Sequence, residues 1–200
     1  TVASPAFDEE HLFISGWTMG AGVSRIPGYN ELLEHDENGD GTIARSEATG
    51  PARMHFPYID ADKDGAIDRT EWETMTDIFN KSENALLALK PSLTLNTPPT
   101  LSWKQTRGLP YVPSPLAYNG HVYLVKNGGM ISCMNAQTGE VLYREERLGA
   151  LGDYYASPIA AGKHVVVASQ SGVVSVIEAG SPELNVVFQV DLDETIMATP

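Results

Sequence analysis

The stretch SPLAYNGHVYLVKNGGMISCMNAQTGEVLYREE, residues 114–146, consists of short apolar runs separated by turn residues. Asn-Gly at 119–120, Asn-Gly-Gly at 127–129 and Thr-Gly at 138–139 are sequences typical of tight hairpins. Strands are therefore expected at residues 116–118, 121–126, 130–135 and 141–145. Strands joined by such short turns pair with their sequence neighbours, so the stretch predicts a four-stranded antiparallel meander.

The opening of this stretch occurs three times, as SPAFDEEHLFIS (4–15), SPLAYNGHVYLV (114–125) and SPIAAGKHVVVA (157–168). In each copy the serine precedes a histidine by seven residues, and the histidine begins an apolar run. Thr199-Pro200 has the form of a fourth opening. The openings at 114, 157 and 199 are 43 and 42 residues apart, the period of a four-stranded propeller blade. We interpret the recurring serines as architectural rather than nucleophilic.

The repeat predicts a mainly β protein with about three β-propeller blades, each a four-stranded antiparallel meander. They form an incomplete ring, because closed propellers have four to eight blades, so we expect the chain to be a fragment. The third blade repeats the strands of the second at 159–161, 164–169, 173–178 and 185–190. In the first blade the opening strands, within 4–17, are separated from the later strands at 84–90 and 101–104. The expected divisions are 1–20 with 84–110 (first blade), 24–82 (an inserted α-helical pair of EF-hands), 111–152 (second blade), 153–196 (third blade) and 197–200 (start of a further blade).

The insertion contains two calcium-loop motifs, DENGDGTIARSE at 36–47 and DADKDGAIDRTE at 60–71. Both match D-x-[DN]-x-[DN]-G-x5-E at every defined position. Calcium prefers six to eight oxygen ligands, and such a loop supplies them from positions 1, 3, 5, 7, 9 and 12. The predicted ligands of the first loop are Asp36, Asn38, Asp40, the carbonyl of Thr42 and Glu47, with water opposite Ala44. Those of the second are Asp60, Asp62, Asp64, the carbonyl of Ala66, Asp68 and Glu71.

The two loops are expected to act as a pair and to bind two calcium ions. Ile43 and Ile67 occupy position 8 of each loop, where paired EF-hands form a short two-stranded contact. The second loop offers five carboxylates against three, which predicts tighter binding there, although crowded carboxylates also repel one another when no ion is bound. The alternative interpretation is a pair of acidic Asp-Gly turns without metal, since such turns are common in loops.

Composition excludes several classes of function. The chain has 26 acidic and 13 basic residues, with a formal net charge of −13, which argues against nucleic acid and anionic membranes as partners. No run approaches the roughly 18 to 20 apolar residues of a membrane span, and residues 1–20 lack the pattern of a signal peptide. The single cysteine, Cys133, excludes an internal disulfide and a thiolate zinc cluster.

The blade sequences at 109–161 and 168–180, together with the inserted loops, resemble the PQQ-like (pyrroloquinoline-quinone-like) β-propeller repeat proteins of bacteria, some of which carry EF-hands. The resemblance implies an extracytoplasmic location, periplasmic or secreted. Enzymes of the related quinoprotein class place an adjacent cysteine pair near the quinone, whereas Cys133 stands alone. The residues present therefore do not support PQQ as a cofactor.

Three functions remain open at this point. The first is a noncatalytic calcium-binding scaffold or binding module, with a protein or polysaccharide partner on the propeller face. The second is a fragment of a PQQ-dependent quinoprotein dehydrogenase, which is an oxidoreductase. The third is an adaptor that resembles the propeller lipoprotein of outer-membrane assembly. Fold alone does not choose among them.

Overall fold

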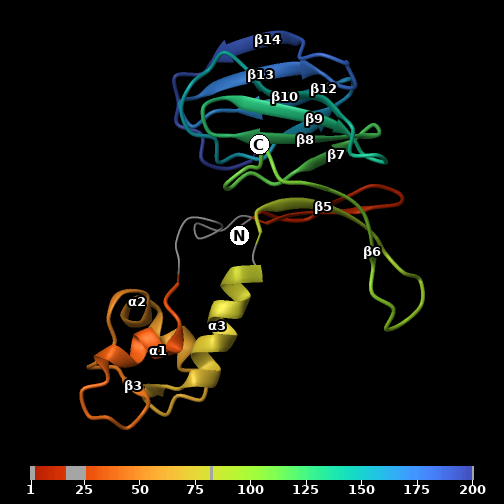
Figure 1. The fold of residues 1–200 in the computed structure, drawn as a ribbon. Coiled ribbons are helices and arrows are strands. Elements are labelled where there is room, and N and C mark those ends of the chain that lie inside the picture. Colours follow the sequence, from red (N-terminus) through yellow and green to blue (C-terminus); the bar gives the residue numbers. More distant parts are fainter. Residues whose placement is uncertain (1–2, 17–25, 82, 200) are drawn as a thin grey trace. The chain divides into compact units, whose positions relative to one another are not determined.

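The second blade forms an antiparallel meander in the computed structural model, which describes residues 3–16, 26–81 and 83–199 (Figure 1). Its strands follow one another across the sheet in the order β10-β9-β8-β7. They are β7 (Leu116–Tyr118), β8 (His121–Lys126), β9 (Met130–Asn135) and β10 (Val141–Arg147). β10 runs two residues further than the sequence pattern predicts. The register between β9 and β10 shifts on both sides of Tyr143, so this edge of the sheet is irregular.

The third blade repeats this arrangement, with the order β11-β12-β13-β14. Its strands are β11 (Ile159–Ala161), β12 (His164–Ala168), β13 (Val173–Glu178) and β14 (Val186–Asp191). β12 ends one residue before the predicted Ser169, because the Ser169 hydroxyl instead accepts the N–H of Val173 and closes the following turn. The predicted mainly β fold class, with four-stranded blades, is confirmed.

The first blade is assembled from two separated parts of the chain, with the order β1-β2-β5-β6. Its strands are β1 (Ala6–Phe7), β2 (Leu12–Gly16), β5 (Ala85–Lys90) and β6 (Thr100–Gln105). β2 and β5 pair without interruption from Leu12 opposite Leu89 to Gly16 opposite Ala85. The helical module is therefore inserted within a blade, between its second and third strands.

The strand β8 is buried on both faces because it lies between two other blades. Val122 and Leu124 pack in a cluster with Phe13 and Leu86 of the first blade. Tyr123 and Val125 alternate with them and pack in a second cluster, which contains Val165, Val167 and Ile177 of the third blade. Burial on both sides explains why this strand reads as a continuous apolar run instead of alternating with polar residues.

Serine residues link the three blades in series. The backbone N–H of Ser4 donates to the hydroxyl of Ser114 at 2.8 Å, and the N–H of Ser114 donates to the hydroxyl of Ser157 at 2.9 Å. The N–H of Ser157 donates in turn to Oγ1 of Thr199 at 3.0 Å. The recurring Ser-Pro pattern thus has a physical cause. The hydroxyl of Ser114 or Ser157 accepts a hydrogen bond from the preceding blade opening, and the N–H of the same serine donates to the following one.

The described part of the insertion contains three α-helices, one 3-10 helix and a two-stranded sheet. Its elements are α1 (Tyr29–Leu32), the 3-10 helix η1 (Leu33–His35), β3 (Ile43–Ala44), α2 (Gly50–Ile59), β4 (Ala66–Ile67) and α3 (Arg69–Lys81). Pro51 lies in the first turn of α2, where its missing N–H has no intrahelical partner to lose. A separate apolar core, which includes Phe56, Ile59 and Trp72, holds the module together.

The chain divides into two units, Thr1–Trp17 with Asn84–Pro200, and Thr18–Glu83. The expected limits at residues 20, 24 and 82 lie outside the described residues, as does Pro200 of the expected fourth opening. Within the described ranges, no helix has the length and apolarity needed to cross a membrane.

Candidate metal centre

The two calcium-loop motifs meet along a short antiparallel bridge. β3 and β4 pair so that Ile43 lies opposite Ile67 and Ala44 lies opposite Ala66. Both isoleucines are fully buried, in the same cluster as Trp72 and Phe56. Position 8 of each loop therefore contributes both a bridge and a core side chain, and the predicted pairing of the two loops is observed.

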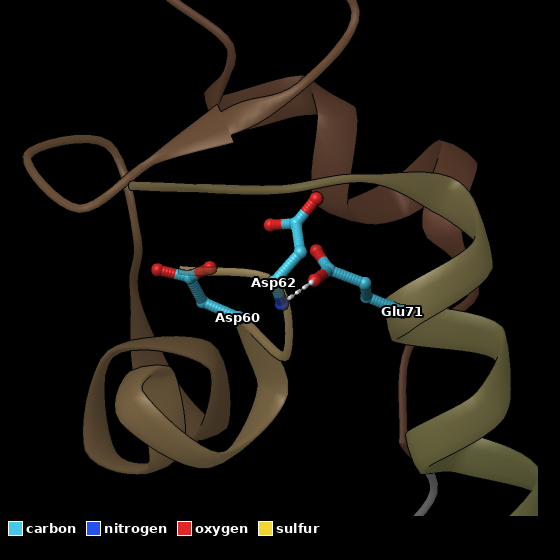
Figure 2. Close-up of side chains that lie close together, drawn as sticks. All are labelled: Asp60, Asp62 and Glu71. Carbon is cyan, nitrogen blue, oxygen red and sulfur yellow. Dashed lines mark hydrogen bonds between the residues drawn. The ribbon is translucent and has the colours of Figure 1, made fainter. Parts of the chain in front are cut away.

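The second loop brings three acidic side chains together. Carboxylate oxygens of Asp60, Asp62 and Glu71 all lie within 4.8 Å of one another. Figure 2 shows Glu71 extending from the beginning of α3 toward the loop backbone at Asp62. These residues hold positions 1, 3 and 12, which supply carboxylate ligands in a calcium loop.

Backbone hydrogen bonds fix Glu71 in this position. Its Oε1 accepts the N–H of Ala61 at 2.7 Å, and its Oε2 accepts the N–H of Asp68 at 3.0 Å. The N–H of Glu71 donates in turn to Oδ1 of Asp68 at 2.8 Å, which closes the first turn of α3. The helix start and the loop are thus joined through one carboxylate.

Gly65 makes the turn that brings the two ends of this loop together. It has a φ of +93°, a backbone conformation that residues other than glycine rarely adopt. Its N–H donates to Oδ2 of Asp60 at 3.3 Å. The glycine at position 6 is therefore required by the backbone, as the motif predicts.

Asp60 provides a direct test of whether a cation fits this loop. Asp60 is only 9% exposed, and its Oδ1 is a buried atom with no hydrogen-bond partner among the residues that the structure describes. A buried carboxylate oxygen without a partner costs free energy, because it has lost its water. The oxygen stands at loop position 1, beside Asp62 and Glu71, where a calcium ion would supply the missing interaction. The donor set is all oxygen, as a hard cation requires.

The first loop has the same framework with fewer charges. Glu47 is 7% exposed, its Oε1 accepts the N–H of Glu37 at 3.1 Å, and its Oε2 accepts the N–H of Ala44 at 2.8 Å. The two oxygens of Asp36 accept the N–H groups of Gly39 and Gly41, at 2.7 and 2.9 Å. Glu47 thus corresponds to Glu71, and Asp36 corresponds to Asp60.

The carboxylate of Asp40, at position 5 of this loop, accepts three hydrogen bonds from within the loop. Its Oδ1 accepts both the hydroxyl and the N–H of Thr42 at 2.8 Å, and its Oδ2 accepts the amide of Asn38 at 2.9 Å. The Thr42 hydroxyl, then the Thr42 N–H and the Asn38 amide, lower the pKa of the Asp40 carboxyl. Asp40 is therefore held in the anionic form that a metal ligand needs.

The other predicted ligands of the second loop are Asp64, the carbonyl of Ala66 and Asp68, and their role as ligands stays a prediction. Asp64 Oδ1 accepts the N–H of Ala66 at 2.9 Å, which fixes the backbone just before the Ala66 carbonyl, the expected ligand. Within the described residues, the set of three acidic side chains close enough to share one ion is that of Asp60, Asp62 and Glu71 in the second loop. In the first loop, Asn38 takes the position that matches Asp62 and carries no charge. The prediction that the second loop binds more tightly stays a prediction.

Tyr29 joins the two loops and was not predicted from the sequence. Its hydroxyl lies 2.9 Å from the carbonyl oxygen of Gly41 in the first loop and 3.0 Å from that of Ile67 in the second. The residue is 4% exposed. The calcium-loop motif does not include Tyr29, because it lies seven residues before the first loop. The sequence marks the position only by an aromatic residue directly after Pro27-Gly28.

Comparisons with known proteins agree with this geometry. The family model described as "EF hand" matches residues 55–76, which contain the whole second loop. Among curated protein sequences, none matches the chain significantly.

Solved structures that resemble the chain include a europium-containing methanol dehydrogenase (17% identity, TM-score 0.42). The match covers 54% of this chain and 21% of the dehydrogenase chain. BamB from Moraxella catarrhalis (15%, TM-score 0.41) covers 53% and 30%. A β-propeller domain from Myceliophteria thermophila (14%, TM-score 0.39) covers 55% and 39%. The chain thus spans well under half the length of these structures. The family match supports an EF-hand in the insertion, and none of these comparisons shows a specific relation to bacterial PQQ-like proteins.

Proposed function

We propose that this chain binds two calcium ions, one in each loop, and that the ions stabilise the inserted module of a noncatalytic propeller scaffold. The single observation that carries the proposal is the buried, unpartnered Oδ1 of Asp60 beside the carboxylates of Asp62 and Glu71. The ligands of the first ion would be those of the matching positions around Asp36 and Glu47.

A stabilising role follows from the thermodynamics of linked binding. Clustered carboxylates repel one another in the absence of a cation, which destabilises the folded module. An ion that binds only the folded form adds RT ln(1 + [L]/Kd), about 2.7 kcal/mol at a hundredfold excess over Kd. Calcium in extracellular fluids is at millimolar concentration, so even weak sites would be filled there. We therefore propose a constitutive structural role in an extracytoplasmic protein.

The alternatives differ in what the blades would bind. In the described residues the free cysteine, Cys133, is buried in the core between the second and third blades, which gives no support to a cysteine pair beside a quinone. We therefore propose a scaffold with a protein or polysaccharide partner in preference to a quinoprotein dehydrogenase fragment. The assembly-adaptor alternative shares the blades but has no role for the two loops. Added PQQ that binds and quenches tryptophan fluorescence would favour the dehydrogenase.

Calorimetric titration of the chelator-stripped chain with calcium tests the proposal. We expect two ions per chain and a melting temperature that rises with calcium concentration. Asp60→Ala should remove one ion. The matched control is Glu37→Gln, which removes an exposed carboxylate at position 2 of the first loop, where no side-chain ligand is expected. The absence of both binding heat and thermal shift in the unsubstituted chain would overturn the proposal.

A further inference from the structure

We propose that Tyr29 couples the two calcium loops, so that occupation of one loop raises the affinity of the other; this inference rests on the proposed function. Tyr29 belongs to α1, which enters the first loop, yet its hydroxyl reaches carbonyl oxygens of both loops, Gly41 and Ile67, at 2.9 and 3.0 Å. A phenol has one proton, so the two carbonyls share a single donor.

The two carbonyl groups are placed where ion binding is felt. Gly41 directly precedes Thr42, whose carbonyl is the position 7 ligand of the first loop. Ile67 directly follows Ala66, whose carbonyl is the position 7 ligand of the second loop. A peptide that turns its carbonyl toward an ion also reorients its neighbour, so either ion would change the hydrogen bond that Tyr29 makes to that loop. A change at either loop would therefore alter how the single hydroxyl proton of Tyr29 is shared between the two carbonyl oxygens.

The ring of Tyr29 is held firmly enough to transmit such a change. The guanidinium of Arg69 lies over it, 4.8 Å from the ring centroid, and donates to Oδ1 of Asn30 at 2.7 Å. Trp72 Nε1 donates to the carbonyl of Pro27 at 2.9 Å, on the other side of Tyr29 in the chain. Arg69 and Trp72 flank the ligand Glu71 within two residues on α3. The helix that carries the second loop's last ligand is thus clamped to the segment that enters the first loop.

This link adds to the bridge between Ile43 and Ile67 and meets it at the carbonyl of Ile67. The bridge itself joins the loops through backbone pairing. Tyr29 adds a side-chain contact that a single atom removes, since phenylalanine has the same ring without the hydroxyl.

The experiment is a calorimetric calcium titration of the full chain, stripped by chelator, and of Tyr29→Phe. The unsubstituted chain should bind two ions with positive cooperativity, and Tyr29→Phe should bind two ions with the coupling factor reduced by about fivefold, at the low end of typical allosteric couplings. Tyr58→Phe is the matched control, because Tyr58 lies on the same module and is 86% exposed; it should leave the coupling unchanged.

Single-site backgrounds separate coupling from simple loop stabilisation. In Glu47→Gln or Glu71→Gln, one loop is disabled and no partner site remains to couple. Adding Tyr29→Phe there should change the affinity of the surviving loop by no more than about twofold, because the hydroxyl acts between sites. An equal loss in these backgrounds would show that Tyr29 merely supports one loop, and would overturn the inference.

The remaining outcomes are also decisive. Two independent ions in the unsubstituted chain, or unchanged coupling in Tyr29→Phe, would overturn the inference and leave the proposed function intact. No bound ion in the unsubstituted chain would overturn the proposed function itself. If circular dichroism shows that Tyr29→Phe does not fold, Arg69→Gln replaces it: loss of the guanidinium that holds the ring should also lower the coupling, and unchanged coupling would contradict the proposal.

Discussion

The indole ring of Trp103 lies directly against Gly139 of the neighbouring blade. A Cβ atom at Gly139 would be 2.7 Å from Cδ2 of Trp103, closer than carbon atoms pack. Trp103 Nε1 also donates to the carbonyl of Ala136 at 2.9 Å, in the same turn between β9 and β10. The first and second blades thus meet through an aromatic ring on a glycine turn, and the turn has no room for a side chain.

Gly139→Ala should therefore destabilise the blades more than an ordinary substitution at a glycine turn. Gly139 has a φ of +72°, so alanine costs about 1 kcal/mol in the backbone, and displacement of Trp103 adds about 1–3 kcal/mol. Gly120→Ala is the matched control, with a φ of +75° and no atom within 4 Å of the added Cβ. Denaturant unfolding monitored by tryptophan fluorescence gives both values, and equal losses would contradict the packing argument.

Ser114→Ala should remove one step of the serine link between blades. It leaves the N–H of Ser4 without its acceptor, with an expected loss of about 0.5–1.5 kcal/mol of unfolding free energy. Ser114→Thr should restore most of that loss, because Thr199 already plays the accepting role at the third step. Ser102→Ala, at an exposed position of β6, controls for a change of composition alone. A threonine variant as unstable as the alanine variant would contradict the hydrogen-bond role.

Asp60→Asn should have opposite effects with and without calcium. Without calcium, the substitution removes one of three clustered charges and gives the buried Oδ1 position a neutral group, so the melting temperature should rise. With excess calcium, the variant should melt below the unsubstituted chain, because ligand charge sets affinity and the second loop should bind about tenfold more weakly or worse. Differential scanning calorimetry in chelator and in calcium measures both signs; a lower melting temperature in chelator would argue against charge repulsion.

The core between the second and third blades should lose stability at high pH. Burial raises the pKa of the Cys133 thiol from 9.0 to about 11 and that of the Tyr123 phenol from 10.0 to about 12. Burial also raises the pKa of the neighbouring Tyr143 phenol. The folded state therefore binds these protons more tightly than the unfolded chain. Their stabilising contribution is complete below pH 9 and is lost as the pH rises from 9 through 12.

Thiol labelling provides an independent readout of the same core. At pH 8 in the folded chain, Cys133 should react with a disulfide reagent far more slowly than in denaturant, because it is both fully buried and protonated. Rapid labelling under native conditions, or a melting temperature that is constant from pH 8 to 11, would contradict the assignment.

The turns and the calcium ligands can be predicted from the sequence, because each depends on residues close together in the chain. Asn119-Gly120 and Thr138-Gly139 mark turns because Asn119, Gly120 and Gly139 have positive φ, and these turns predict the bounds of β7 to β10 within two residues. The calcium ligands were named because a metal ion fixes their spacing. In contrast, the run of Val122, Tyr123 and Leu124 predicts a strand but not that its two sides face different blades, which depends on residues far away in the chain.

Contacts between distant residues explain the remaining gaps. Tyr29 and Ile67 are 38 residues apart, and neither belongs to a pattern that relates them. The helical segment that enters the first loop is a single turn of α1 followed by η1. Pro27-Gly28 limits it on one side and the loop limits it on the other. Its residues Tyr29 and Leu32 are buried in the core of the module, and Arg69 and Trp72 of α3 contact the same segment.

Because Gly16 pairs with Ala85, the insertion is a cassette, a segment that begins and ends at neighbouring positions of two paired strands. Its two ends are held side by side by β2 and β5, as the ends of a two-residue hairpin loop would be. The entropic cost of closing a loop grows only with the logarithm of its length, so the host blade tolerates a long insertion there at little expense in stability. Because the module also carries its own apolar core, the same cassette would fit any antiparallel hairpin whose strand ends are a ladder spacing apart, and gain or loss of calcium binding needs no redesign of the blade.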